Sequence, residues 1–390
     1  MIRRRSFIEH VFALVAAASL LAVPTLSHGA LSPIDIGAIL PSTGPFAAGG
    51  EAALNALALA ADEINADGGV LGHPIRLDSG DTEGRPEIAR AEALRLIERD
   101  RVWAVIGGYL SEETLLVQEV AATERVLHIV PVAAAMEITD RIARDPQYRY
   151  SFRVAYNITQ WAELLSDYLL DQHVHTYAFV GAAIQWNQEL ARDLADRLRD
   201  RGISELSRSS YSPTSPVIDP IVIALRTHPP DVVVVGDPGP DSIEFVKLAR
   251  ELGLGSEILS VGGALGDARV ARTLPRGAYL TFQAAAWRGL TPQATRYWGA
   301  FQNRYHYLPV GYSDTLPHDA LIVLAEAARA AHSIDRDRVA TALAGGRFPG
   351  AAGTYAFDRS HQAMWGEGGL RGVVIAWENG EDHVIFPLRR

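Results

Sequence analysis

A serine stands where this sequence could hold a small anion. Ser111 follows a short apolar run, Val102–Gly107, and comes directly before a segment with helical periodicity. The free N–H groups at a helix N-terminus, together with a serine hydroxyl, can bind a carboxylate or phosphate. A serine at such a place can instead cap its own helix. Both interpretations stay open from the residues alone.

Two acidic residues and two histidines are the other candidates for chemistry. Glu112 and Glu113 could form a catalytic carboxylate pair, but carboxylates at the start of a helix are favoured by the helix dipole, which indicates a structural role. His173 and His175 have the spacing of one face of a strand, yet no third metal ligand lies near them in the sequence. The sequence therefore predicts neither a catalytic pair nor a metal site.

Motifs of the common enzyme classes are absent from the sequence. It contains no Gly-x-Ser-x-Gly elbow, Walker loop, His-Glu-x-x-His pair or dinucleotide-binding fingerprint. We therefore predict a protein that is not an enzyme and that needs no cofactor.

Alternating strand and helix patterns should position these residues. Apolar runs at 34–40, 75–81, 102–107, 127–131, 177–180, 231–235 and 258–261 read as strands, and amphipathic segments between them read as helices. This order is typical of an α/β fold, and we predict two doubly wound parallel-sheet lobes joined by a hinge. In such sheets a ligand binds beyond the carboxyl ends of the strands. The candidate residues in the first lobe are therefore Ser42, Phe46, Tyr109, Ser111, Val132 and Ala134.

Composition and the N-terminus indicate an exported protein. The formal charge of −10 argues against a nucleic-acid partner, and the absence of cysteine excludes disulfides and lipid attachment through cysteine. Residues 1–30 place Arg3 to Arg5 before a short apolar run, which is the layout of a secretory signal peptide. Arg4 and Arg5 also fit the twin-arginine export pattern. We expect a protein free in the periplasm.

One segment carries a family resemblance. Residues 61–77, ADEINADGGVLGHPIRL, resemble the early signature of the Leu/Ile/Val-type (type I) periplasmic solute-binding proteins of ABC importers. The resemblance implies three crossings between the lobes, with residues 31–153 and 284–349 in the first and 154–283 and 350–390 in the second. It also implies second-lobe ligand contacts at Trp186, Asp237 and Gly263.

Departures from the family pattern suggest the kind of ligand. Ala134 stands where the family usually has a hydroxyl, and Gly263 stands near the position of the acid that pairs with an α-ammonium group. Amino acids are the family's usual ligands. We hypothesise that a carboxylate or amide without an ammonium group binds at least as well, unless Asp237 or Glu113 replaces the missing acid.

The resemblance implies that the protein captures a small organic solute, an amino acid or a related carboxylate or amide, and delivers it to an inner-membrane ABC permease. We expect a monomer. A periplasmic ligand-sensing subunit of a signalling receptor is the alternative, because the same fold serves both roles.

Overall fold

The computed structural model of the chain describes residues 31–236, 239–273, 280–378 and 381–387. The predicted signal peptide at 1–30 and the candidate Asp237 lie outside these residues. The described part from Leu31 onward forms one compact unit that contains two large sheets. The residue boundaries of the two predicted lobes remain a prediction.

The first sheet has five parallel strands in the order β2-β1-β3-β4-β5. Alternate side chains of β1 enter cores on opposite faces, so Ile36 and Ala38 pack on one face and Ile39 on the other. The strands span Ile34–Leu40 (β1), Ile75–Asp81 (β2), Ala104–Gly107 (β3), Leu127–Val130 (β4) and Ser151–Arg153 (β5).

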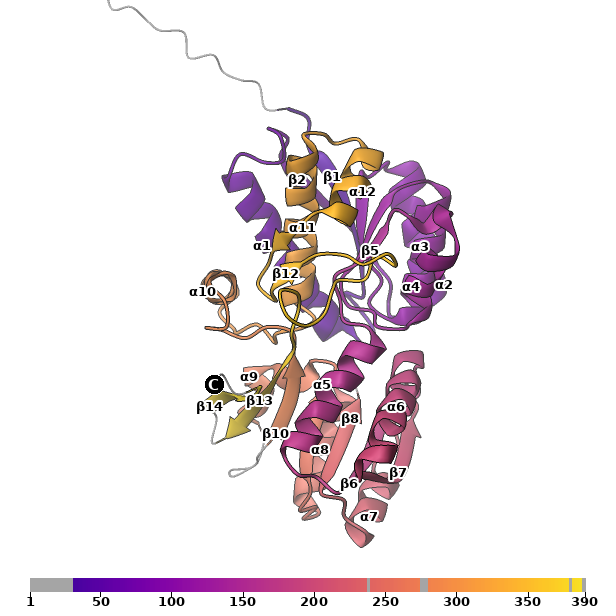
Figure 1. Cartoon of the computed structure of the whole chain (residues 1–390), viewed down its shortest axis with the longest axis vertical. Coiled ribbons are helices and arrows are strands. Elements are labelled where there is room, and N and C mark those ends of the chain that lie inside the picture. Colours follow the sequence, from indigo (N-terminus) through magenta and orange to yellow (C-terminus); the bar gives the residue numbers. More distant parts are fainter. Residues whose placement is uncertain (1–30, 237–238, 274–279, 379–380, 388–390) are drawn as a thin grey trace, which may run out of the picture. The chain divides into compact units, whose positions relative to one another are not determined.

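Helices cover both faces of this sheet. In Figure 1, α1 and α11 lie on one side of it and α2, α3 and α4 on the other, and α1 packs on α11 while α2 packs on α3. The helices span Ala47–Ala66 (α1), Pro86–Leu94 (α2), Ser111–Thr123 (α3), Glu137–Arg144 (α4), Thr315–Ala331 (α11) and Arg336–Gly345 (α12). A π-helical turn, Arg95–Arg99, continues α2, and Pro146–Tyr148 form a 3₁₀ turn.

The second sheet has seven strands in the order β14-β13-β10-β9-β8-β6-β7. The five strands from β10 to β7 are parallel, whereas β13 and β14 run antiparallel. The strands span Thr176–Ala182 (β6), Ser204–Tyr211 (β7), Val232–Gly236 (β8), Glu257–Val261 (β9), Leu280–Ala284 (β10), Val373–Glu378 (β13) and Glu381–Phe386 (β14).

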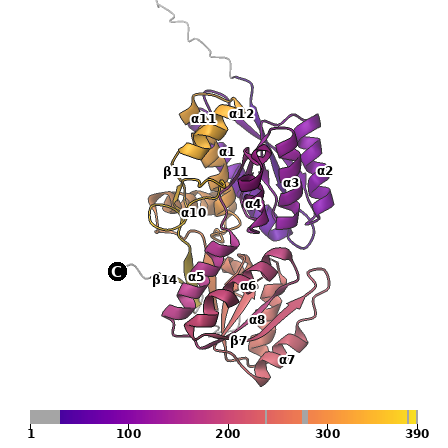
Figure 2. The ribbon, with the colours of Figure 1, turned by 45° about the vertical axis from the view of Figure 1, so that its right-hand side comes forward.

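The helices of the second sheet also pack in pairs. Helices α5 and α6 lie side by side in Figures 1 and 2, and α7 contacts α8. They span Ile158–Asp171 (α5), Gln185–Leu198 (α6), Asp219–Thr227 (α7), Asp241–Glu251 (α8) and Ala268–Ala271 (α9), with 3₁₀ turns at Arg199–Arg201 and Ala264–Gly266. Helix α10 (Pro292–Tyr305) contacts α1, and a short antiparallel pair joins Phe348–Pro349 (β11) to Thr354–Tyr355 (β12).

The predicted α/β class with doubly wound, largely parallel sheets is confirmed. Four strands of the second sheet, β7, β10, β13 and β14, are not among the predicted runs. β7 carries mostly exposed polar side chains at the sheet edge, and β13 and β14 are antiparallel additions at the opposite edge. The second sheet is therefore mixed rather than wholly parallel.

Candidate functional site

Loops that follow strands of both sheets meet around a small cavity. Its volume is about 30 Å³, room for on the order of two water molecules. The lining residues come from the ends of β3, β4 and β9, from the first turn of α6, from α5 and from the loop before α11. They are Tyr109, Leu110, Ser111, Val132, Ala133, Ala134, Trp161, Trp186, Gly262 and Tyr312. We call this space the cleft cavity.

Ser111 provides the hydroxyl of the cleft cavity. It is the first residue of α3 and only 1% exposed, and its Oγ accepts a hydrogen bond from the Ala135 N–H at 3.2 Å. Leu110, not Ser111, is the N-cap residue of α3, so the alternative interpretation of Ser111 as a helix cap is wrong. The N–H groups of the first turn of a helix have no partner within the helix, so those at the start of α3 are suited to binding an anion beside Ser111.

Glu113 caps α3 from within the helix. One carboxylate oxygen accepts from the Tyr109 and Leu110 N–H groups, and the other accepts from the Thr82 hydroxyl at 3.0 Å. Burial raises the pKa of Glu113 to about 7, although these hydrogen bonds act in the opposite direction. Both oxygens thus hold the loop that carries Tyr109 and Ser111, and Glu113 is fully buried and does not line the cleft cavity.

Aromatic rings form the other walls of the cleft cavity. The rings of Trp161 and Tyr312 lie 4.6 Å apart, and the Tyr312 hydroxyl donates to the Val132 carbonyl at 3.0 Å. Trp186, at the second position of α6, is 7% exposed. The cavity therefore combines the Ser111 hydroxyl and a helix N-terminus with a largely apolar, aromatic interior.

A second cavity of about 270 Å³ adjoins the first, because Tyr109 lines both. Phe46 and Gly263 line it, and the Phe46 and Tyr109 rings are 6.3 Å apart. Its charged residues, Asp267 and Arg269, form an ion pair with each other. The two cavities together offer a polar corner at Ser111 and a larger space beyond Tyr109.

Comparison with known proteins identifies the family of this chain. A family model described as periplasmic binding protein matches residues 33–371. The chain belongs to the periplasmic binding protein family. The fold and family are those of solute-binding proteins.

Two relatives of this binding protein are named as amino-acid-binding proteins. The Leu/Ile/Val-binding protein homolog 7 of Brucella abortus is 27% identical over 94% of this chain and 95% of its own length. An amino acid binding protein of Pseudomonas aeruginosa is 27% identical over 65% of this chain and 67% of its own length. The predicted Leu/Ile/Val-type resemblance is confirmed.

Solved structures share the fold of this binding protein. The branched-chain amino acid transporter substrate binding protein LivJ from Streptococcus pneumoniae, in complex with isoleucine, has a TM-score of 0.78 at 20% identity and covers 90% of this chain and 99% of its own. An ABC transporter solute binding protein from R. palustris, in complex with benzoate, has a TM-score of 0.80 at 18% identity, with 90% and 95% covered.

The predicted ligand residues of the binding protein are brought together in part. Tyr109, Ser111, Val132, Ala134 and Trp186 line the cleft cavity, and Phe46 and Gly263 line the adjoining one. Ser42 lines neither. It is exposed, and its N–H donates to Asp81 at 2.9 Å.

Two aromatic residues of the cleft cavity were missed by sequence reasoning. Trp161 lies in α5 and Tyr312 before α11, and neither follows a strand of the predicted sheets. The only signal was that Trp161 comes shortly after the predicted crossover at Arg153.

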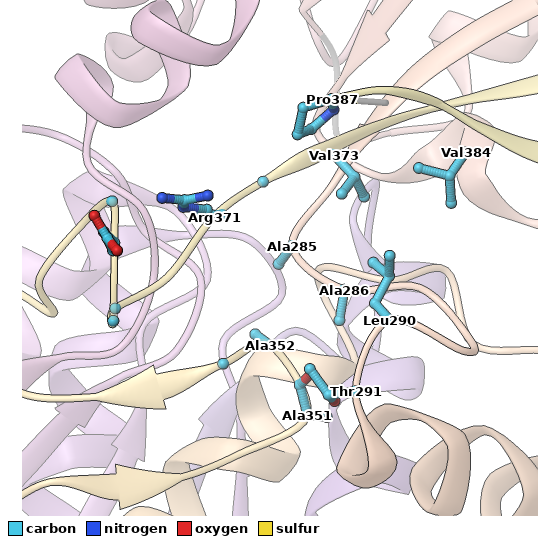
Figure 3. Close-up of a pocket in the computed structure, with 16 residues that line it drawn as sticks. Ala285, Ala286, Leu290, Thr291, Ala351, Ala352, Arg371, Val373, Val384 and Pro387 are labelled. Atoms are coloured by element: carbon cyan, nitrogen blue, oxygen red, sulfur yellow. The ribbon is translucent and has the colours of Figure 1, made fainter. Parts of the chain in front are cut away.

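A third cavity, of about 670 Å³, lies away from these residues. It is lined by the chain after β10, by residues 351–353 and by residues 366–373, and much of this lining is glycine and alanine. Figure 3 shows Val373, Val384 and Pro387 on one side of it and Ala351, Ala352 and Thr291 on the other. None of the predicted ligand residues lines it, so its size does not make it the candidate site.

Two further features concern metals and membranes. Among the described residues, no group of three or more histidine and acidic side chains is placed to hold a metal ion. In the same part of the chain, no helix has the length and apolar character needed to cross a bilayer.

Proposed function

We propose that this binding protein captures a small carboxylate with an apolar or aromatic body in the cleft cavity and delivers it to an inner-membrane ABC permease. The observation that carries the proposal is the position of Ser111. It places a buried hydroxyl and the N-terminus of α3 in the same cavity as Trp161 and Trp186.

The polar corner suits a carboxylate. The Ser111 Oγ accepts from Ala135, so its own proton remains available for a ligand oxygen. The helix N-terminus adds favourable electrostatics for a negative charge. A ligand oxygen at this corner could therefore accept from the Ser111 hydroxyl and from the N–H groups at the start of α3.

The remaining walls suit an apolar or aromatic body rather than an ammonium group. No carboxylate is among the described residues that line the cleft cavity, and Asp267 in the adjoining cavity is paired with Arg269. A buried ammonium group without an acidic partner would lose several kcal/mol of hydration. Carboxylates without an ammonium group are thus the favoured class, and amino acids are the competing one.

Solute capture requires the cavity walls to separate. A space of about 30 Å³ is smaller than any such solute, so binding needs an open form that closes over the ligand. A solute that touches residues of both sheets binds the closed form better, and this difference in affinity drives closure. The predicted lobes, 31–153 with 284–349 and 154–283 with 350–390, would be the moving bodies.

The ligands in two similar solved structures support the choice of solutes to test. The structural neighbours were solved with isoleucine and with benzoate. The cysteine-free composition and the N-terminal pattern support export to the periplasm, with the twin-arginine route as one option. We propose that the protein meets its permease there as a monomer.

Isothermal titration calorimetry with isoleucine, phenylalanine, benzoate and 4-methyl-2-oxopentanoate tests the proposal. We expect benzoate or the 2-oxo acid to bind at least as tightly as either amino acid. Binding of an amino acid tenfold tighter, about 1.4 kcal/mol, would contradict the ligand class. The absence of binding by every member of this set would contradict the proposal of a carboxylate site.

A further inference from the structure

Helix α6 begins without a cap of its own. Its N-cap residue, Ile184, makes no side-chain hydrogen bond to the helix, and its first turn contains no acidic residue. The carboxylate of Glu112 caps the helix instead, because the Gln185 N–H donates to Glu112 Oε1 at 3.0 Å. Glu112 belongs to α3, which packs on the first sheet.

A carboxylate of α6 in turn accepts a hydrogen bond at the start of α4, a helix beside the first sheet. The N-cap residue of α4, Met136, makes no side-chain cap, and its N–H donates to Glu189 Oε2 at 3.3 Å. Glu189 belongs to α6, and its other oxygen accepts from Gln185 Nε2 at 2.8 Å, which fixes the orientation of the carboxylate. Each carboxylate thus lies at the start of a helix that packs with the other sheet, where the helix dipole favours negative charge.

We propose that Glu112 and Glu189 form a reciprocal latch that holds the two walls of the cleft cavity together around a bound solute. The inference rests on the proposed function and concerns how the site stays closed. Glu112 and Glu189 are positioning residues: neither lines the cleft cavity.

The place of the latch in the chain supports this role. Glu112 directly follows Ser111, and Gln185 directly precedes Trp186, so both residues of the first contact are adjacent to residues that line the cleft cavity. In the second contact, Met136 lies two residues after Ala134, and Glu189 lies one helical turn after Trp186. The Gln185–Glu112 hydrogen bond joins the first turns of α3 and α6, and these two turns carry Ser111 and Trp186 into the walls of the same cavity. Closure of the cavity and formation of the latch are therefore the same movement.

The latch is incomplete, which keeps closure dependent on the solute. Glu112 Oε2 is buried and has no hydrogen-bond partner among the described residues. A buried, unpaired carboxylate oxygen is costly, and opening of the cleft would return it to water. The latch therefore adds to the stability of the closed form without holding an empty cleft shut on its own.

Pulsed electron paramagnetic resonance measures the latch directly. Because the chain contains no cysteine, spin labels at Glu124→Cys and Asp200→Cys, two exposed positions near the ends of α3 and α6, report the distance between the two sides. The distance is measured in the otherwise unchanged protein, in Glu112→Ala/Glu189→Ala and in Glu119→Ala. Glu119 is an exposed acid on α3 with no side-chain partner among the described residues, so it is the matched control.

We expect the double variant to shift toward longer distances and the control to match the parent protein. The conservative variant Glu112→Gln/Glu189→Gln keeps an acceptor oxygen at each place and should lie between them. With benzoate and isoleucine as probes, each lost carboxylate should raise the dissociation constant about two- to fivefold and leave the order of preference unchanged.

The outcomes separate the latch from the proposed function. If neither probe binds the parent protein, the carboxylate site fails, while the distances without solute still report the latch. Distance distributions that superimpose for the parent and both double variants, with and without solute, would overturn the latch.

Discussion

The Ser111 hydroxyl accepts a hydrogen bond from the Ala135 N–H, which joins the start of α3 to the loop after β4. These two loops follow neighbouring strands of the first sheet, so the contact fixes the corner where the carboxyl ends of β3 and β4 meet. The hydroxyl keeps its proton for a ligand. A corner held by contacts within the protein itself needs less ordering when a solute binds.

The first prediction concerns this hydroxyl. Ser111→Ala should weaken binding of the preferred carboxylate by about 1–3 kcal/mol, because a ligand oxygen in a dry site is left without its donor. Calorimetry gives the affinity, and Ser207→Ala on the exposed edge strand β7 serves as the control. An unchanged affinity would remove Ser111 from the site, and an equal loss of affinity in the control would show that the effect is not specific.

A second prediction concerns the aromatic walls. Trp186→Ala should raise the dissociation constant by about tenfold or more through loss of the ring, whereas Trp186→Phe should restore part of the affinity. Trp161→Phe should have a smaller effect, since a six-membered ring can still pack on Tyr312. If Trp186→Ala lowered the free energy of unfolding of the solute-free protein by as much as it lowered the free energy of binding, the residue would be structural.

A third prediction concerns stability on binding. Saturation at 100 times the dissociation constant should stabilise the folded protein by about 2.7 kcal/mol, because the solute binds only the folded state. Thermal unfolding with rising benzoate or isoleucine concentration measures this shift. A melting temperature that stays constant for a solute that calorimetry shows to bind would contradict binding to the native fold.

A fourth prediction concerns His318 in α11. Burial alone would lower its pKa, but hydrogen bonds to Asp319 and Glu63 outweigh this and raise the pKa to about 9. A raised pKa means that the stabilisation is complete below the unfolded pKa of about 6.5 and is lost as the pH rises through about 9.

His318→Gln should therefore be less stable than the parent protein by on the order of 2 kcal/mol at acidic pH, and this difference should shrink above the folded pKa. Urea unfolding of both proteins at several pH values measures it, and titration of groups that do not interact with His318 cancels in the comparison. A difference that is independent of pH would contradict the charged state of His318.

The sequence predicted strands best where turn residues delimit an apolar or alternating run. The β1 and β2 boundaries, Ile34–Leu40 and Ile75–Asp81, agree with prediction because turn residues delimit each run. Strand β7 escaped prediction because its exposed edge position permits polar residues such as Ser207 and Arg208. The spacing of apolar residues in a sequence indicates which side chains are buried, and β7 has only one buried residue.

The site was predictable only where it follows strands. Tyr109 and Ser111 come directly after β3, so the general rule for doubly wound sheets was enough to select them. Trp161 and Tyr312 reach the cleft cavity from α5 and from the loop before α11. Their approach depends on how distant segments pack, which no local pattern contains.

The most direct test of the central claim is a crystal structure of the protein saturated with its preferred carboxylate. We predict that a carboxylate oxygen lies within hydrogen-bond distance of Ser111 Oγ and that the body of the solute contacts Trp161 and Trp186. A solute bound instead in the cavity beside Ala285 and Arg371, with the cleft cavity empty, would contradict the account.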